Sequence, residues 1–270
     1  MTLHTFRAIP ASSEVYGLAE GPVWDAGRER VLWVDINAGA VHSGILRDDR
    51  VEARERFTID VTAGAVACAV TGELLVAGTR GLHTVATDGK VTAGVQLIPD
   101  AKVSRLNDGK CDPAGRFLVG SMALDDRTGE EVLLSIGHTG SITVLDGDLT
   151  LSNGLGWSPD ATVLYSTDTI PGVIWSRAYD VDASVSRSQA DRDWITASPR
   201  PSDSTTSARS SPAPAPAAPA RRSTSTRGRK GAALLPCSWV GFVFGWGSAL
   251  PTSLALLVRA TLRYRSLRWL

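Results

Sequence analysis

The chain has 270 residues, with 28 Lys and Arg, 28 Asp and Glu, and a formal net charge of zero. This length can bury a substantial core, and the neutral balance argues against a nucleic-acid-binding protein. Three cysteines without metal-type spacing and an N-terminus without a signal segment indicate a reducing, cytoplasmic setting. The sequence contains no HExxH, GxSxG or GxxxxGK[ST] motif, so zincin, serine-hydrolase and P-loop chemistry have no support.

Four segments in chain order share one pattern. They begin AEGPVWD at 19, TAGAVAC at 62, NDGKCDP at 107 and SNGLGWS at 152, and their aligned glycines are Gly21, Gly64, Gly109 and Gly154. The spacings between these glycines are 43, 45 and 45 residues (64−21, 109−64 and 154−109), which is the length of one β-propeller blade. The sequence therefore predicts an all-β fold with about four recognisable blades in residues 1–185.

Each repeat predicts a short strand, a turn and a β-rich second strand. The second strands are VLWVDI from 31, LLVAGT from 74, FLVGSM from 117 and VLYSTD from 163, and the expected third strands include GLHTVA from 81 and GSITVL from 140. No segment up to Ala183 has a helical period. Sheets of this kind cover one another when they pack radially.

Polar residues occupy equivalent positions in three of the repeats. The residues just before the aligned glycines are Glu20, Ala63, Asp108 and Asn153, with Asn107 adjacent. Carboxylate and amide oxygens from separate blades suit Ca²⁺, Mg²⁺ or Mn²⁺, whereas Zn²⁺ more usually recruits His or Cys. Two alternatives stay open: the Asx-Gly pairs could be hairpin turns, and Glu20 could be a solvated acid at a strand start.

The motifs AEGPVWD, RLNDGKCDPAGRFLVGSM and SNGLGWSPD, in this order, resemble the SMP-30/gluconolactonase/luciferin-regenerating-enzyme-like (regucalcin) family. The resemblance covers roughly residues 14 to 183. It implies a six-bladed β-propeller with one divalent metal ion (Ca²⁺, Zn²⁺, Mg²⁺ or Mn²⁺) in the central channel and, in many members, hydrolysis of a sugar lactone. A small sugar lactone is thus the expected partner, with no nucleic acid and no membrane.

The resemblance also implies residue roles. By motif match, Glu20 and Asn153 resemble metal ligands, Arg105 and Asn107 resemble substrate contacts, and Asp125 is a looser match to an acidic substrate contact. The repeat alignment favours Asp108 over Asn107; a bulge at the start of the strand could turn Asn107 inward. Arg105 could instead be a surface salt-bridge residue.

The family's Pro-Asp-Gly turn, whose Asp is a metal ligand and the expected catalytic base, has no counterpart here. Asp203 stands at about the right distance after Asn153 but in the context RPSDST. It could be the functional acid and metal ligand, or its position could be accidental, and we favour the accident.

The last third of the chain departs from the repeats. Residues 186–230 are rich in Ser, Pro, Ala and Arg, a composition that predicts disorder, and 231–270 form an apolar run followed by a basic tail. The abrupt change favours a shift of reading frame near residues 180–199, although a linker with a membrane anchor is an alternative. The function predicted is a metal-dependent lactone hydrolase; the alternatives are a non-catalytic calcium-binding propeller and an inactive truncated or frameshifted member.

Overall fold

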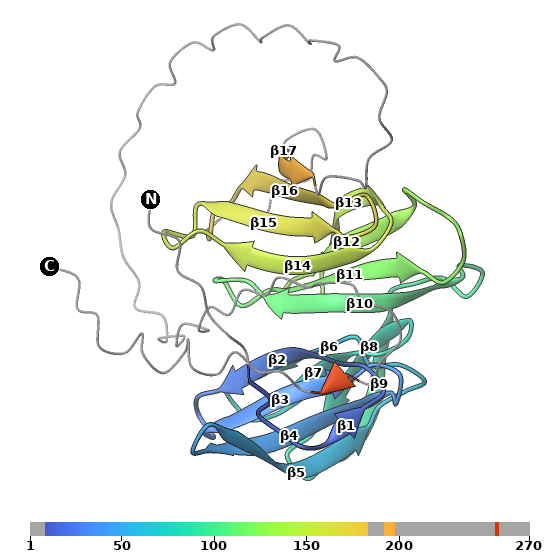
Figure 1. The fold of residues 1–270 in the computed structure, drawn as a ribbon. Helices are drawn as coiled ribbons and strands as arrows, with labels where there is room; N and C mark the ends of the chain where they lie inside the picture. The colour runs from blue at the N-terminus through green and yellow to red at the C-terminus, as the bar shows by residue number, and fades with distance from the viewer. Residues whose placement is uncertain (1–8, 183–191, 198–251, 254–270) are drawn as a thin grey trace, which may run out of the picture. The chain divides into compact units, whose positions relative to one another are not determined.

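The computed structural model describes residues 9–182, 192–197 and 252–253. Nearly all regular structure in these residues is β-strand, arranged as four antiparallel four-stranded sheets, each made of consecutive strands (Figure 1). Within the described residues, no helix is long and apolar enough to cross a membrane. The apolar run 231–258, the disordered segment predicted over 186–230 and Asp203 lie almost wholly outside the described residues.

The first two sheets follow the predicted order of strands. Sheet one comprises β2 (Ala19–Asp25), β3 (Arg30–Asp35), β4 (Ala40–Arg47) and β5 (Arg50–Thr58). Sheet two comprises β6 (Ala65–Cys68), β7 (Leu74–Ala77), β8 (Gly81–Val85) and β9 (Val91–Gln96). A short strand β1 (Val15–Tyr16) pairs with β18 (Thr252–Ser253).

Sheet three comprises β10 (Ser104–Cys111), β11 (Phe117–Ala123), β12 (Glu131–Ile136) and β13 (Ile142–Leu149). Here one strand assignment was wrong: the segment from Gly140 belongs to the fourth strand of the sheet, and the third strand is β12. The run EVLLSI, which follows a connection at 124–130 that is longer than in the other sheets, forms β12 and was passed over.

Sheet four comprises β14 (Ser152–Trp157), β15 (Val163–Asp168), β16 (Val173–Ala178) and β17 (Arg192–Ala197). β17 lies after residue 185, where the sequence pattern ends, and pairs along β16 from Val173↔Ala197 to Arg177↔Arg192. The fourth sheet therefore has the same number of strands as the other three.

Most buried apolar residues lie between consecutive sheets, and a further cluster packs the N-terminal residues Ala11 and Tyr16 against Trp33 of sheet one. One cluster joins Leu32 and Val34 of sheet one to Val66 and Val76 of sheet two. A second joins sheets two and three, and a third joins sheets three and four, where Leu118 and Leu133 pack with residues that include Trp157 and Leu164. Because each sheet buries its faces against its sequence neighbours, the packing is that of propeller blades, as predicted.

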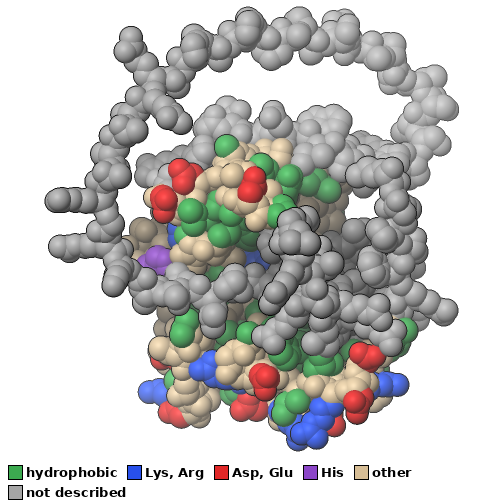
Figure 2. Space-filling view, turned by 90° about the vertical axis from the view of Figure 1, so that its left-hand side faces the viewer, with side chains coloured by type: hydrophobic (Ala, Val, Ile, Leu, Met, Phe, Trp, Pro, Cys, Tyr) green, Lys and Arg blue, Asp and Glu red, His purple; other side chains and the backbone are tan. Residues whose placement is uncertain are grey.

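The surface carries charges of both signs. On the face drawn in Figure 2, basic and acidic side chains of the described residues are interspersed and form no extended patch of one sign.

Candidate functional site

The first strands of the four sheets, called the inner strands below, are β2, β6, β10 and β14. Three of them are bulged at the positions that the repeat alignment singled out. The pairing register shifts between Glu20 and Val23 in β2, between Leu106 and Gly109 in β10, and between Asn153 and Leu155 in β14. A bulge leaves residues unpaired and re-aims their side chains. The bulge expected in RLNDG is therefore present, and the Asx-Gly pairs lie within strands and not in hairpin turns.

The aligned glycines serve two physical purposes. Gly21 and Gly154 adopt positive φ angles of 57° and 52°, which only glycine adopts readily. Gly64, in contrast, packs against the backbone of sheet three: a Cβ at this position would lie 2.3 Å from the carbonyl oxygen of Asn107. The inner strands of sheets two and three thus approach closely beside the candidate site.

Arg105 and Asn107 form a buried pair. Their residues are 8% and 4% exposed, and Nη1 of Arg105 donates to Oδ1 of Asn107 at 2.8 Å. Nδ2 of Asn107 donates to the carbonyl oxygen of Ser152 at 2.9 Å, which joins sheet three to sheet four. Asn107 therefore points inward, and the alternative of Arg105 as a surface salt-bridge residue is wrong.

Asp108 connects the same two strands through its carboxylate. Its Oδ1 accepts from the N–H of Gly109 and its Oδ2 accepts from the N–H of Gly154, both at 2.8 Å. Oδ1 of Asn153 also accepts from the Gly154 N–H, at 3.1 Å. Burial raises the pKa of the Asp108 carboxyl, although the two N–H donors act in the opposite direction.

Glu20 of sheet one lies within electrostatic range of this group. Burial, followed by the negative charge of Asp108, raises the pKa of Glu20 to about 7, while the positive charge of Arg105 lowers it. Burial lowers the pKa of the Arg105 guanidinium, and Glu20 opposes that change. The structure thus brings Glu20, Arg105 and Asp108 together from two sheets that are separated in sequence by a third.

Asp125 occupies a different environment. It is exposed in the connection between β11 and β12, and both of its carboxylate oxygens accept from Nε of Arg127 at 2.9 Å. The hydrogen bond from Arg127 lowers the pKa of this carboxyl. No hydrogen bond joins Asp125 to Arg105 or Asn107 in the described part of the chain.

The donors present suit a hard divalent cation. Glu20 and Asp108 supply partly buried carboxylates and Asn153 supplies an amide oxygen, and the mutual repulsion of the two acids is what a cation would relieve. Among the described residues, no group of three or more His, Cys, Asp or Glu side chains is placed to hold a metal ion. Asp203, the acidic ligand that the sequence leaves as an alternative to an accidental position, lies outside the described residues.

Sequence reasoning missed several residues around this site. It did not identify Arg127 as the partner of Asp125, nor the buried carboxylate of Glu131 beneath both. For Arg127 the available signal was the polar stretch from Leu124 to Glu130 between FLVGSM and EVLLSI, which is longer than the connections of the other repeats.

Comparison with known protein families gives a match over the part of the chain that contains these motifs. The family profile described as the SMP-30/Gluconolactonase/LRE-like region matches residues 18–206, well over half of the chain. The chain belongs to this family. Its described sheets are accordingly the blades of a family propeller.

Among characterised relatives, the chain is 31% identical over 183 residues to 6-deoxy-6-sulfogluconolactonase of Pseudomonas putida, covering 67% of this chain and 62% of the relative. It is 32% identical over 179 residues to regucalcin of Gallus gallus, covering 63% and 56%. It is 29% identical over 163 residues to pentonolactonase XacC of Haloferax volcanii, covering 60% and 54%. The chain therefore spans less than two thirds of the length of these relatives.

Solved structures give the same fold. A calcium-binding protein, regucalcin, from Agrobacterium tumefaciens superposes with a TM-score of 0.58 at 26% identity, covering 65% of this chain and 59% of the other. A luciferin-regenerating enzyme superposes with a TM-score of 0.60 at 24% identity, covering 68% and 62%. Relatives named as lactonases place the chain in a hydrolase family.

Proposed function

We propose that this chain hydrolyses a sugar lactone with a divalent metal ion held at the bulged starts of the inner strands. The observation that carries the proposal is the convergence of Glu20 with Arg105 and Asp108 at aligned bulges. Its lactonase relatives support the reaction class. Glu20 and Asn153 would hold the metal, which would polarise the lactone carbonyl and lower the pKa of a bound water.

The chain's own side chains would orient the substrate. Arg105 uses Nη1 for Asn107 and for the carbonyl oxygen of Leu106, and its other guanidinium N–H groups bond to no described residue. They would donate to sugar hydroxyls or to the carbonyl oxygen as negative charge develops there. The bond between Asn107 and the Ser152 carbonyl fixes the orientation of the amide that Arg105 contacts.

The donor types also rank the possible metals. Oxygen ligands favour Ca²⁺, Mg²⁺ or Mn²⁺ over Zn²⁺, because Zn²⁺ prefers imidazole or thiolate.

The test is hydrolysis of gluconolactone by the full chain, after chelator treatment and readdition of each of the four metals, with the spontaneous rate subtracted. We expect metal-dependent hydrolysis, and a loss of about a hundredfold in kcat/KM in Glu20→Gln, corresponding to about 2.7 kcal/mol of transition-state stabilisation. Glu52→Gln is the matched control, because Glu52 is an exposed acid paired with Arg54 on β5. A rate no faster than the spontaneous reaction under every condition would refute the proposal.

A second candidate is metal binding without turnover, as the calcium-binding regucalcin relative suggests. The observation that favours it is that, near the bulges, the described residues supply carboxylates only from Glu20 and Asp108. Metal binding measured by calorimetry, together with no lactone hydrolysis, would select this function over the first.

A further inference from the structure

The connection between β11 and β12 is extended beside the candidate site. It spans 124–130, whereas the equivalent connections of the other sheets span 36–39, 78–80 and 169–172. It leaves β11 immediately after the residues that pair with the start of β10, where Arg105 lies opposite Met122. The extra residues of sheet three are therefore placed next to the strand that carries Arg105 and Asn107.

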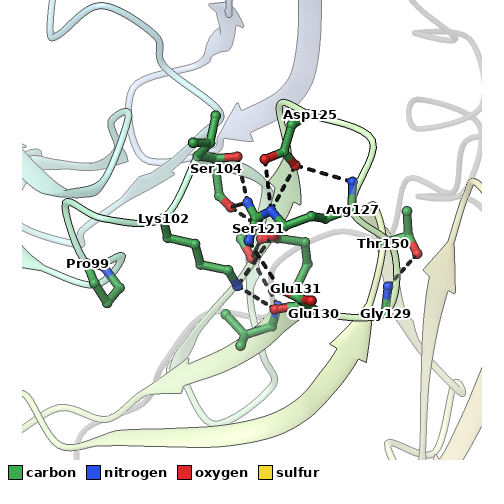
Figure 3. A network of polar contacts seen from close by, with 12 residues as sticks. Pro99, Lys102, Ser104, Ser121, Asp125, Arg127, Gly129, Glu130, Glu131 and Thr150 are labelled. Carbon is green, nitrogen blue, oxygen red and sulfur yellow. Dashed lines mark hydrogen bonds and ion pairs between the residues drawn. The ribbon is translucent and has the colours of Figure 1, made fainter.

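Arg127 ties this connection to β10 through a single guanidinium group (Figure 3). Nε contacts both carboxylate oxygens of Asp125 at 2.9 Å. Nη2 donates to the carbonyl oxygen of Val103 at 2.9 Å and to Oγ of Ser104 at 3.1 Å. Since Ser104 directly precedes Arg105, one side chain fixes the distance between Asp125 and the start of the substrate-contacting strand.

Glu131 is a buried hydrogen-bond acceptor that supports this arrangement. Its residue is 1% exposed, and its carboxylate accepts hydrogen bonds from Oγ of Ser104 at 2.7 Å and from Oγ of Ser121. Nζ of Lys102 lies 3.3 Å from the same carboxylate. Ser104 is thus held by Glu131 and by Arg127 together, so the end of the Arg127 bridge at β10 is fixed.

The opposite side of the connection is fixed to the next sheet. The N–H of Gly129 donates to Oγ1 of Thr150 at 3.0 Å, and Met122 forms a β-bridge with Leu151. Thr150 and Leu151 lead directly into β14, which carries Asn153. The extended connection therefore spans the starts of the two strands that bear most of the candidate site.

We propose that Arg127 is a positioning residue that fixes Asp125 as a hydrogen-bond acceptor for a hydroxyl group of a polyhydroxylated lactone, an inference that rests on the proposed function. Nε of Arg127, in contact with both carboxylate oxygens of Asp125, favours the ionised carboxylate, so Asp125 accepts a hydrogen bond and does not transfer a proton. The bridge to Val103 and Ser104 gives that acceptor a fixed place relative to Arg105. The site thereby selects lactones that bear ring or chain hydroxyls.

The experiment compares two lactones, gluconolactone and the unsubstituted δ-valerolactone, on wild type, Arg127→Gln, Arg127→Lys and Asp125→Asn. For gluconolactone, Arg127→Gln raises KM about tenfold with a smaller change in kcat, while δ-valerolactone hydrolysis keeps its rate, because only the first substrate offers hydroxyls. Arg127→Lys does not restore the preference, since one ammonium group cannot contact Asp125 and the Val103 carbonyl in the same geometry. Combining Arg127→Gln with Asp125→Asn adds no further loss.

The matched control is Arg54→Gln, which removes an exposed Arg–Glu pair on β5 and leaves both rates unchanged. Equal loss on both lactones in Arg127→Gln, or no loss on either, would overturn the role of Arg127 while the proposed function stands. No hydrolysis of either lactone by the wild type would overturn the proposed function, and the role of Arg127 within it.

Discussion

Replacing Gly64 with alanine tests the close approach of the inner strands of sheets two and three. A Cβ at residue 64 would lie 2.3 Å from the carbonyl oxygen of Asn107 and 2.7 Å from that of Leu106, whereas real Cβ atoms essentially never come within 3.0 Å. The atoms that must move are backbone atoms, so the strands have to separate by at least 0.7 Å (3.0 minus 2.3 Å). Overpacking of this kind costs about 1–3 kcal/mol.

Urea unfolding followed by tryptophan fluorescence measures that cost as a lower midpoint at unchanged slope. Gly147→Ala is the control, because Gly147 is exposed on β13 and a Cβ there meets nothing within 4 Å. Alanine at such a position stabilises by about 0.4–1 kcal/mol through the unfolded chain, so the two variants shift in opposite directions. If Gly64→Ala unfolds at the same midpoint as Gly147→Ala, β6 and β10 do not approach as described.

Three further predictions concern buried or site carboxylates. Glu131→Ala lowers the free energy of unfolding by about 1–3 kcal/mol, because it leaves the buried hydroxyls of Ser104 and Ser121 without their acceptor. The exposed Glu130→Ala changes the free energy of unfolding by less than about 0.5 kcal/mol, and urea midpoints of the two variants check this. Asp168→Ala removes the acceptor of two N–H groups in the β13–β14 connection, held at 3.0 and 2.9 Å, and we expect faster amide exchange there than in wild type. In metal-free protein, the raised pKa of Glu20 means that the folded state binds more protons than the unfolded state, so the free energy of unfolding falls as pH rises from about 4.5 to about 7. Glu20→Gln flattens this dependence on pH. A free energy of unfolding that rises over the same pH range in wild type would contradict the raised pKa of Glu20.

The repeat made most of the fold predictable from sequence. Glycines at a regular spacing and β-rich runs after each turn identified the second strand of every described sheet. Prediction failed in sheet three, where the third strand, Glu131–Ile136, follows an extended connection at 124–130 and the fourth strand was taken in its place. A period locates equivalent strands only while the connections between them keep their length.

The position of the bulge in β10 at the candidate site was predictable to within one residue. The alignment favoured Asp108 because it stands before Gly109, but the bulge between Leu106 and Gly109 leaves both Asn107 and Asp108 out of the ladder, so each acquires an inward contact. The sequence gives no sign of the buried Glu131, because its partners Ser104 and Ser121 come from other strands. A buried carboxylate that is satisfied across strands leaves no local pattern.

Blade packing and the candidate site depend on the same atoms. Asn107 holds Arg105 through its carbonyl oxygen and sheet four through its amide, so its removal loosens the sheet contact and the guanidinium together. An Asn107 variant therefore loses the contact between sheets and the contact to Arg105 at the same time. Glu20 makes no hydrogen bond to a described residue, so a Glu20 variant tests the proposed metal site with the inner strands left in place.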